Sequence, residues 1–335
     1  MGAILKLGMR SIVGQIKETA KASPMLTRMA YNVWNASHYS NLFKHEQLLA
    51  DEARCDAYAE AITRNIKPGS TVVDMGTGTG LLAMLAARVE GTHVYAIDHS
   101  DFISIAEKVA RSNGFDNITF VKTNSQSFKP DSKVDVILHE QMGDDLFQEN
   151  MVYNLLDLKS RILKDDGIIL PGRFQLFVEP VVIHPDFHTG FITELNVHGL
   201  DFSLLQKEAV ENNFIPKDYY LRYMDGRGFK HRLTSPKPAL DFDLNAMTSQ
   251  EDIPTEIILD QTFIRDGRLG GFGIWYNIVF DDEMQLSTSP FQRNTHWAHR
   301  IYRAPARQVK KGETIKYKLS MPDLIRTLSW SVETL

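Results

Sequence analysis

The stretch Thr71-Val-Val-Asp-Met-Gly-Thr-Gly-Thr-Gly80 decides the fold of the first half of this chain. Residues of high β propensity lead to an acidic residue, and glycine then recurs at every second position. The run Leu81-Leu-Ala-Met-Leu-Ala-Ala-Arg88 that follows has the composition of a helix. A strand that turns into a helix over glycines is typical of the ligand-binding edge of an α/β sheet, because only glycine lets a ligand approach the backbone closely there.

The spacing of the glycines narrows the choice of ligand. They read Gly76-x-Gly78-x-Gly80, which differs from the wider spacing of dinucleotide-binding turns. A second strand is predicted over 93–98 and ends on Asp98, where a carboxylate can hold the two hydroxyls of a ribose. The pattern favours a nucleoside with a small charged tail, and S-adenosylmethionine fits that description. An ordinary tight turn in an α/β domain is the alternative.

Composition limits the classes of function. The chain has 335 residues, 43% hydrophobic and 24% charged, which is enough for two globular domains. Its net charge of −5 argues against a general nucleic-acid or membrane-surface binder and suits a cationic substrate. Cys55 is the only cysteine, which excludes a disulfide within the chain and a cysteine-rich metal site. A reducing, cytoplasmic location is expected, or a nuclear one in a eukaryotic cell.

Hydrophobic periodicity predicts a cofactor domain of the Rossmann-like α/β class over residues 36–171. Residues 1–35 are expected to form one or two short amphipathic helices, and a further helix is expected from about 48 to 66. Predicted strands then alternate with predicted helices, which indicates a mostly parallel sheet. The strands are expected over 72–75, 93–98, 118–122, 134–138 and 167–170, and the helices over 80–90, 101–113 and 150–163.

Beyond residue 171 the pattern changes to period-two alternation, as in Phe272-Gly-Ile-Trp-Tyr-Asn-Ile-Val-Phe280. Such runs indicate antiparallel strands in a sandwich or a barrel, and we predict a β-barrel domain over 172–335. Residues 187–222 interrupt the strands with apolar residues at helical spacing. This insertion is either local packing or an arm that meets a second subunit.

An acidic segment follows the fourth predicted strand, at the edge of the sheet where ligands bind. It reads Glu140-Gln-Met-Gly-Asp-Asp-Leu-Phe-Gln-Glu149 and holds four carboxylates. Like charges repel, so this crowding makes sense if a positive group lies among them. A planar guanidinium pairs bidentately with carboxylates and keeps its charge at any accessible pH. A solvated loop or a divalent-metal site is the alternative, although no ordered ligand spacing is present.

Taken together, these motifs resemble the protein arginine methyltransferase family, over nearly all of the chain beyond about residue 35. That family has two glutamates nine positions apart after the fourth strand, as Glu140 and Glu149 are here. A second signature, Thr-His-Trp in the β-barrel domain, stands as Thr295-His296-Trp297. The helix before the sheet also matches, through His45-Glu46, Leu49, Asp51 and Arg54.

The resemblance implies a role for each matching residue. Glu140 and Glu149 would clamp the substrate guanidinium, and His296 would face Asp51 across the two domains, either holding the site together or accepting the released proton. Arg54 would pair with the carboxylate of S-adenosylmethionine. The other implied cofactor contacts are Asp98 at the ribose, Asp74, Gly76 and Gly78 at the methionine part, His45 along the cofactor, and Ser125 and Gln126 near the adenine. Tyr39, Met142 and Trp297 would line the substrate side.

The chain also departs from the family pattern. Gln141 replaces a tryptophan after the first glutamate, and Asp144 and Asp145 replace a Tyr-Cys pair after Met-Gly. We therefore expect Asp144 and Asp145 to contact the substrate and to make the site more polar, which would suit even the α-amino group of free arginine. No metal is expected.

The sequence thus predicts an S-adenosylmethionine-dependent N-methyltransferase acting on the guanidino group of arginine in proteins or peptides. A methyltransferase of free L-arginine or another small guanidino compound is the alternative, and a catalytically idle scaffold is a further one. The resemblance also implies a homodimer in which the arm over 187–222 docks on the cofactor domain of the other subunit.

Overall fold

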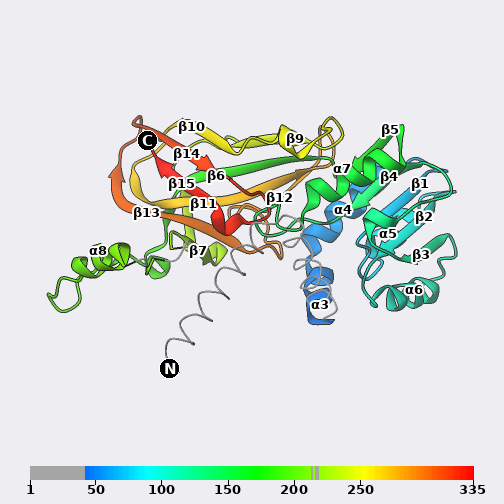
Figure 1. The fold of residues 1–335 in the computed structure, drawn as a ribbon, viewed down its shortest axis with the longest axis horizontal. Helices are drawn as coiled ribbons and strands as arrows, with labels where there is room; N and C mark the ends of the chain where they lie inside the picture. Colours follow the sequence, from blue (N-terminus) through cyan, green and yellow to red (C-terminus); the bar gives the residue numbers. More distant parts are fainter. Residues whose placement is uncertain (1–41, 213, 216–218) are drawn as a thin grey trace, which may run out of the picture.

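The first domain is built around a five-stranded parallel sheet. The computed structural model describes residues 42–212, 214–215 and 219–335. The strand order is β3-β2-β1-β4-β5, and all four pairings are parallel (Figure 1). The predictions for residues 1–35 and for Tyr39 lie outside the described residues. Within the described part of the chain, no helix is long and apolar enough to cross a membrane.

The elements of this domain follow the alternation that the sequence predicts. The helices are α3 (Leu42–Ala50), α4 (Glu52–Asn65), α5 (Leu81–Ala87), α6 (Ile103–Ser112), η1 (Ser125–Ser127) and α7 (Met151–Ile162). The strands are β1 (Thr71–Met75), β2 (His93–Asp98), β3 (Ile118–Lys122), β4 (Val134–His139) and β5 (Leu163–Leu170). The single helix expected over 48–66 is two helices, because Asp51 caps α4 by accepting a hydrogen bond from the Arg54 amide at 3.0 Å.

The second domain consists of antiparallel strands. Its strands are β6 (Arg173–Ile183), β7 (Leu221–Met224), β8 (Phe229–Arg232), β9 (Leu240–Asp243), β10 (Glu256–Thr262), β11 (Gly267–Val279), β12 (Gln285–Ser287), β13 (His299–Val309), β14 (Thr314–Ser320) and β15 (Ser331–Thr334). Its short helices are η2 (Pro185–Phe187), η3 (Ile192–Glu194), α8 (Ser203–Glu211), η4 (Gly226–Gly228), η5 (Gln250–Asp252) and η6 (Thr327–Ser329).

These strands do not close into the predicted barrel. They form a seven-stranded sheet with the path β7-β13-β11-β6-β8 and a separate three-stranded sheet, β10-β14-β15. The period-two pattern shows which face of a strand is buried but not which strands pair at the edges, so it cannot distinguish closure from two sheets. The prediction of antiparallel β structure is confirmed, whereas the described strands give no closed barrel.

The core of the second domain lies on both faces of the long central strand β11. Phe272, Ile274 and Tyr276 point into the main core that the two domains share. Trp275, on the opposite face, packs with Phe177 and other residues in a smaller cluster. The end of β11 pairs with β12, and β12 lies beside α4 of the first domain.

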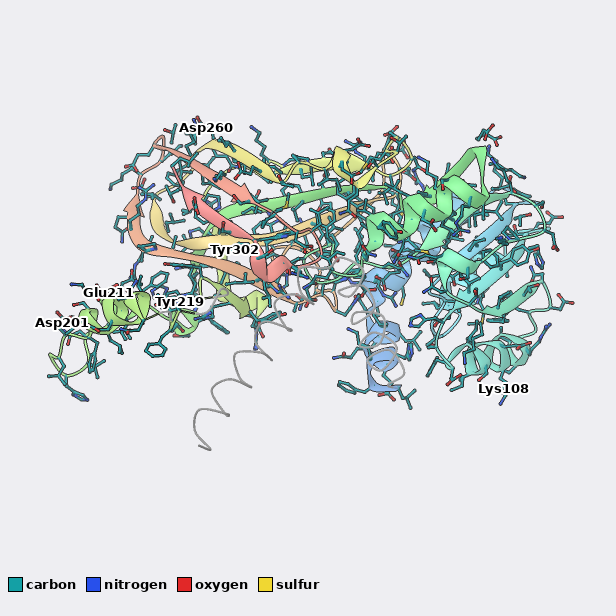
Figure 2. All side chains as sticks on the ribbon, in the orientation of Figure 1. Lys108, Asp201, Glu211, Tyr219, Asp260 and Tyr302 are labelled. Carbon is teal, nitrogen blue, oxygen red and sulfur yellow. The ribbon has the colours of Figure 1, made fainter. Side chains whose placement is uncertain are left out.

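The insertion over 187–222 is partly helical, as the sequence predicts, and it projects from the β domain. It contains η3 and α8, and α8 has no buried residue. Figure 2 shows Asp201, Glu211 and Tyr219 along this arm, at the opposite end of the molecule from Lys108 of α6. The arm therefore lies far from the cofactor domain of its own chain.

A buried carboxyl group in the β domain gives a first prediction. Glu179 of β6 is fully buried, neither of its side-chain oxygens has a hydrogen-bond partner, and the nearest cation is Arg232 at 3.9 Å. Burial raises the pKa of Glu179 to about 7, although Arg232 opposes the shift. The folded state then holds the proton more tightly than the unfolded state, so stability falls as the pH rises from about 4.5 to 7.

We expect Glu179→Gln to remove the loss of stability that the wild type shows as the pH rises. At pH 8 the variant should be more stable than the wild type by about 3 kcal/mol at most, and the difference should shrink toward pH 5. Urea unfolding at several pH values measures it. A difference that stays the same between pH 5 and pH 8 would show that the ionisation of Glu179 is not its cause.

Candidate active site

A cavity lies at the carboxyl ends of β1, β2 and β4, next to the β domain. It is lined by residues of five segments that are far apart in the sequence. They are His45, Leu48, Arg54, Gly76, Thr77, Gly78, Thr79, Leu81, Leu82, Asp98, His99, Ser100, Glu140, Gln141, Met142, Glu149 and His296. The cavity thus brings together the glycine turn, both predicted clamp glutamates and the predicted β-domain histidine.

The glycine turn forms the floor of this cavity. Gly76 and Gly78 have φ angles of +76° and +53°, a conformation that other residues adopt only with strain. A Cβ atom on Gly78 would lie 3.4 Å from the His45 ring, and one on Gly76 would lie 3.1 Å from Gln141. The turn therefore needs glycine both for its backbone and for the space above it.

Two aspartates fix the shape of the turn. Asp98, at the end of β2, accepts hydrogen bonds from the Gly78 amide at 3.1 Å and the Ser100 amide at 2.8 Å. Asp74 is buried beneath the turn and accepts a bond from the Thr77 hydroxyl at 2.6 Å. Burial raises the pKa of Asp74 to about 7. A carboxylate has about four acceptor positions, so Asp98 keeps capacity for ribose hydroxyls, whereas Asp74 supports the turn from below.

Arg54 and Glu140 form an ion pair inside the cavity. Arg54 Nη1 lies 3.2 Å from Glu140 Oε2, and Arg54 Nη2 donates to the Leu48 carbonyl oxygen at 2.6 Å. Arg54 Nε is buried without a hydrogen-bond partner, so the guanidinium retains a donor for a carboxylate. Burial raises the pKa of Glu140, and the charge of Glu149 adds to the rise, while Arg54 and His296 oppose it.

We expect Arg54→Ala to weaken the binding of S-adenosylhomocysteine by about 10- to 100-fold, the usual loss for a hydrogen bond to a charged group. Isothermal titration measures the dissociation constant. Arg64→Ala is the matched control, because Arg64 lies on the same helix but is exposed and pairs with Asp281. An unchanged dissociation constant in Arg54→Ala would refute the assignment.

His45 lies against the glycine turn from α3. Its ring is buried and stacks on Phe102, with the ring centroids 4.0 Å apart. This stacking fixes the ring at the place where it meets Gly78. His45 lines the cavity, and its contact with the cofactor stays a prediction.

The predicted contact between Asp51 and His296 is present. Asp51 Oδ2 accepts from the His296 amide and lies 2.8 Å from His296 Nδ1, while Oδ1 caps α4 through Arg54. Burial by itself would raise the pKa of Asp51, but the bonds from His296 and Arg54 outweigh it and lower the pKa. Asp51 thus ties the β domain to the start of the helix that carries Arg54.

The acidic loop (residues 140–149) is held from the β domain by two aromatic residues. The Trp297 indole donates to the Met142 carbonyl oxygen at 2.8 Å, and the Tyr276 hydroxyl donates to the Gly143 carbonyl oxygen at 3.0 Å. Met142 lines the cavity, whereas Trp297 is buried behind it and is absent from the lining. The position of Trp297 corrects the expectation that it forms a wall of the substrate site: it anchors the loop.

The two aspartates of the acidic loop also bind their own chain. Asp145 is fully buried and pairs with Arg300 of β13, which itself lies over the Tyr223 ring. Asp144 accepts a hydrogen bond from the Ala298 amide at 2.9 Å. A carboxylate buried against an arginine has no surface left for a substrate, which corrects the expectation for Asp145. Neither aspartate lines the cavity.

The adenine contacts remain predictions. Ser125 and Gln126 form η1, where the Gln126 amide donates to Asn124 and the Ser125 carbonyl oxygen accepts from Arg161. Neither residue lines the cavity. Within the ranges that the structure describes, no group of three or more His, Cys, Asp or Glu residues could hold a metal ion.

The sequence did not single out all of the residues that build the site. His99 lines the cavity beside Asp98, and its place directly after the acidic end of β2 was a signal that could have found it. Arg300 and Tyr276 hold the acidic loop through contacts that span more than 130 residues. No local pattern marks such partners, because the register of β11 and β13 creates them.

The residues present fit S-adenosylmethionine. The turn leaves room for a backbone-to-ligand contact, Asp98 lies at the end of β2, and Arg54 Nε is a buried donor without a partner. These are the groups that a ribose and an amino-acid carboxylate require.

Comparison with known families agrees with this site. Residues 66–185 match a family model described as a methyltransferase domain, and residues 175–333 match one described as the arginine methyltransferase oligomerization subdomain. Together the two matches cover the β domain and the part of the cavity from the glycine turn onward, whereas His45, Leu48 and Arg54 lie before the first match.

Individual relatives of the chain are named protein arginine N-methyltransferases. The chain is 30% identical to protein arginine N-methyltransferase 6 of Xenopus tropicalis over 77% of each chain. It is 30% identical to protein arginine N-methyltransferase 1 of Schizosaccharomyces pombe over 90% of this chain and 87% of the relative. With protein arginine N-methyltransferase 2 of Xenopus tropicalis, also 30% identical, it shares 83% of its own length and 65% of the relative.

Solved structures support the fold. Arabidopsis thaliana protein arginine methyltransferase 10 superimposes with a TM-score of 0.71 at 23% identity, over 85% of this chain and 89% of the other. The Trypanosoma brucei PRMT1 enzyme-prozyme complex with AdoHcy gives 0.70 at 24% identity, over 84% and 88%. The chain therefore belongs to the protein arginine N-methyltransferase family and is an S-adenosylmethionine-dependent methyltransferase.

Proposed function

We propose that this enzyme transfers a methyl group to a guanidino nitrogen of arginine in proteins or peptides. The observation that carries the proposal is the placement of Glu140 and Glu149 in one cavity with Arg54 and the glycine turn. A guanidinium is a planar cation that two carboxylates can grip from different sides. The names of the relatives agree with this substrate.

The carboxylates orient and polarise the substrate. S-adenosylmethionine supplies an electrophilic methyl group when it is bound. Glu140 and Glu149 hold the guanidinium so that one nitrogen faces that group, and they draw positive charge toward the other nitrogens. The methylated nitrogen must lose a proton during or after the transfer, because the free guanidinium has a very high pKa.

His296 has a positioning role in this proposal. The Asp51 carboxylate accepts hydrogen bonds from the backbone amide and from the ring of His296. The same carboxylate caps α4 by accepting a bond from the Arg54 amide. The pair therefore sets the distance between Arg54 on α4 and the β-domain anchor Trp297.

Protein arginine is favoured over free arginine. The polar character expected from Asp144 and Asp145 was the reason for considering free arginine. Asp145 is buried and paired with Arg300, whereas Asp144 is half-buried and accepts one hydrogen bond, from the Ala298 amide. Asp145 therefore gives no support to free arginine, and the names of the relatives favour arginine in proteins.

A labelling experiment tests the choice of substrate. Protein and isotopically labelled S-adenosylmethionine are incubated in parallel with an arginine-rich peptide mixture and with free L-arginine. We expect label in the peptides and none in free arginine. Label in free arginine alone would overturn the proposal.

We further propose that the enzyme is a homodimer formed through the arm. The arm exposes apolar side chains, among them Leu200, Leu204, Leu205 and Phe214. The α3 and α6 surfaces of the cofactor domain expose another set: Leu42, Phe43, Leu49, Ile105 and Val109. Because the arm and α6 lie at opposite ends of one molecule (Figure 2), the arm can cover this second surface only in another copy.

The oligomeric state of an arm variant tests whether the arm forms the dimer interface. The double variant Leu204→Lys/Leu205→Lys should run as a monomer in size-exclusion chromatography with light scattering, whereas the wild type should run as a dimer. Ile258→Lys is the control, because Ile258 is equally exposed but lies on β10. A dimer that survives in the double variant would contradict the proposed interface.

A cytoplasmic location, or a nuclear one in a eukaryotic cell, is proposed as well, since the single cysteine suits a reducing compartment.

A further inference from the structure

Among the described residues that line the cavity, two side-chain atoms are buried and have no hydrogen-bond partner. One is Arg54 Nε, a donor, and the other is Gln141 Oε1, an acceptor. A buried polar atom without a partner is costly, and such atoms at a binding site mark places where a ligand completes the bond. The Arg54 atom has an expected partner in the cofactor carboxylate, whereas no partner has been assigned to Gln141.

Gln141 lies on the cofactor side of the cavity. It follows Glu140 at the end of β4, and β4 is the neighbour of β1 with Met75 paired to His139. Its side chain extends over the turn, so that a Cβ atom on Gly76 would lie 3.1 Å from Gln141 Nε2. The carboxamide is therefore placed over the first glycine of the turn, in the cavity that Arg54 also lines.

The two unpartnered atoms match the two charges at the polar end of the cofactor. The amino-acid part of S-adenosylmethionine carries one carboxylate and one ammonium group. Arginine can only donate hydrogen bonds, so Arg54 suits the carboxylate. An amide oxygen accepts, and the ammonium group has only donors to offer. Glu140 Oε2 is already engaged by Arg54 Nη1, whereas Gln141 Oε1 is a buried neutral acceptor without a partner.

We propose that Gln141 Oε1 accepts a hydrogen bond from the α-ammonium group of S-adenosylmethionine. Gln141 is then a cofactor-binding residue that recognises the amino group, while Arg54 recognises the carboxylate. The inference rests on the assigned cofactor but not on the identity of the methyl acceptor. It gives a use to a side chain that departs from the family pattern at this position.

The test compares three ligands that differ at the amino-acid end. Isothermal titration gives the dissociation constants of S-adenosylhomocysteine, its analogue without the α-amino group, and 5′-methylthioadenosine. Gln141→Leu should bind S-adenosylhomocysteine about tenfold more weakly than the wild type, and its affinity for the other two ligands should change less than about twofold. Gln308→Leu, at an exposed position of β13, should bind all three ligands as the wild type does.

Three results would overturn the proposal. Gln141→Leu could bind S-adenosylhomocysteine as tightly as the wild type, it could lose affinity equally for all three ligands, or it could raise only the KM of the peptide. The second result would mean a deformed cavity, and the third a contact with the methyl acceptor. Because the ratio of two dissociation constants within one protein is independent of the folded fraction, Gln141→Met gives the same test if Gln141→Leu folds poorly. Failure of the wild type to bind S-adenosylhomocysteine would instead refute the cofactor assignment.

Discussion

Glu140→Gln is expected to lower the rate of methyl transfer by about 10³-fold while leaving S-adenosylhomocysteine binding within a few-fold of the wild type. The substitution keeps the shape of the side chain but removes its negative charge. The clamp then has one carboxylate, Glu149, for a cation that needs two, and the polarisation of the guanidinium is lost. Cofactor binding is spared because Arg54 loses the competing ion pair with Glu140 and keeps its donors for the carboxylate.

Steady-state kinetics with a single-arginine peptide and titration with S-adenosylhomocysteine measure the two effects separately. Glu60→Gln is the matched control, because Glu60 lies on α4 outside the cavity and its side chain is 62% exposed. Its rate should equal that of the wild type. If the Glu140→Gln enzyme methylates the peptide at the wild-type rate, Glu140 does not clamp the substrate guanidinium.

Arg300→Leu is expected to lower the free energy of unfolding by about 3–5 kcal/mol, the range for breaking one side of a buried ion pair. Arg300 is buried beside Asp145 and also donates to the Thr327 hydroxyl at 3.0 Å. Removing it leaves an uncompensated carboxylate inside the protein. The acidic loop, which Asp145 helps to hold, should then lose its position, so peptide methylation should fall as well.

The pH dependence of this loss has a definite sign. In the wild type, burial raises the pKa of Asp145 to about 6, although Arg300 opposes the shift. Without Arg300 the folded-state pKa lies higher still above the unfolded value of 3.8. The folded variant therefore takes up a proton before the unfolded chain does, and its stability recovers as the pH falls. The destabilisation should be largest above pH 7 and smaller at pH 5.

Urea unfolding at both pH values measures the effect. The double variant Arg300→Leu/Asp145→Leu should regain part of the stability, because no buried charge remains. Arg307→Leu is the control on the same strand: Arg307 is 46% exposed and pairs loosely with Glu313, so about 0–1 kcal/mol should be lost. If Arg300→Leu lowers the free energy of unfolding no more than Arg307→Leu does, the ion pair between Arg300 and Asp145 does not anchor the acidic loop.

The cofactor half of the molecule could be predicted well because its signals are local. The glycine turn and Asp98 lie within one strand-turn-helix-strand unit, and the structure places them together. The contact between Asp51 and His296 could be expected only through family resemblance, since 245 positions separate the two residues. Where the resemblance gave no guidance, at Asp145, the sequence suggested a substrate contact and the structure shows an internal ion pair.

The features that the sequence did not predict depend on tertiary contacts, which no local sequence pattern describes. Alternating apolar residues predict β11 correctly, but the pairing of β10, β14 and β15 as a separate sheet depends on edges that no local pattern describes. Likewise, an acidic loop looks the same in sequence whether its partner is a ligand or Arg300 on β13. Charge crowding predicted that a cation lies among these carboxylates, and for Asp145 that cation is part of the protein.

The position of the transferred methyl group shows most directly whether the enzyme methylates the guanidino group of arginine. A peptide with one arginine and a matched peptide with lysine in its place are incubated with the enzyme and labelled S-adenosylmethionine, then fragmented in a mass spectrometer. We expect label on the guanidino group of arginine and an unlabelled lysine peptide. Label on lysine or on any other group, or no label from an enzyme that binds S-adenosylhomocysteine, would contradict it.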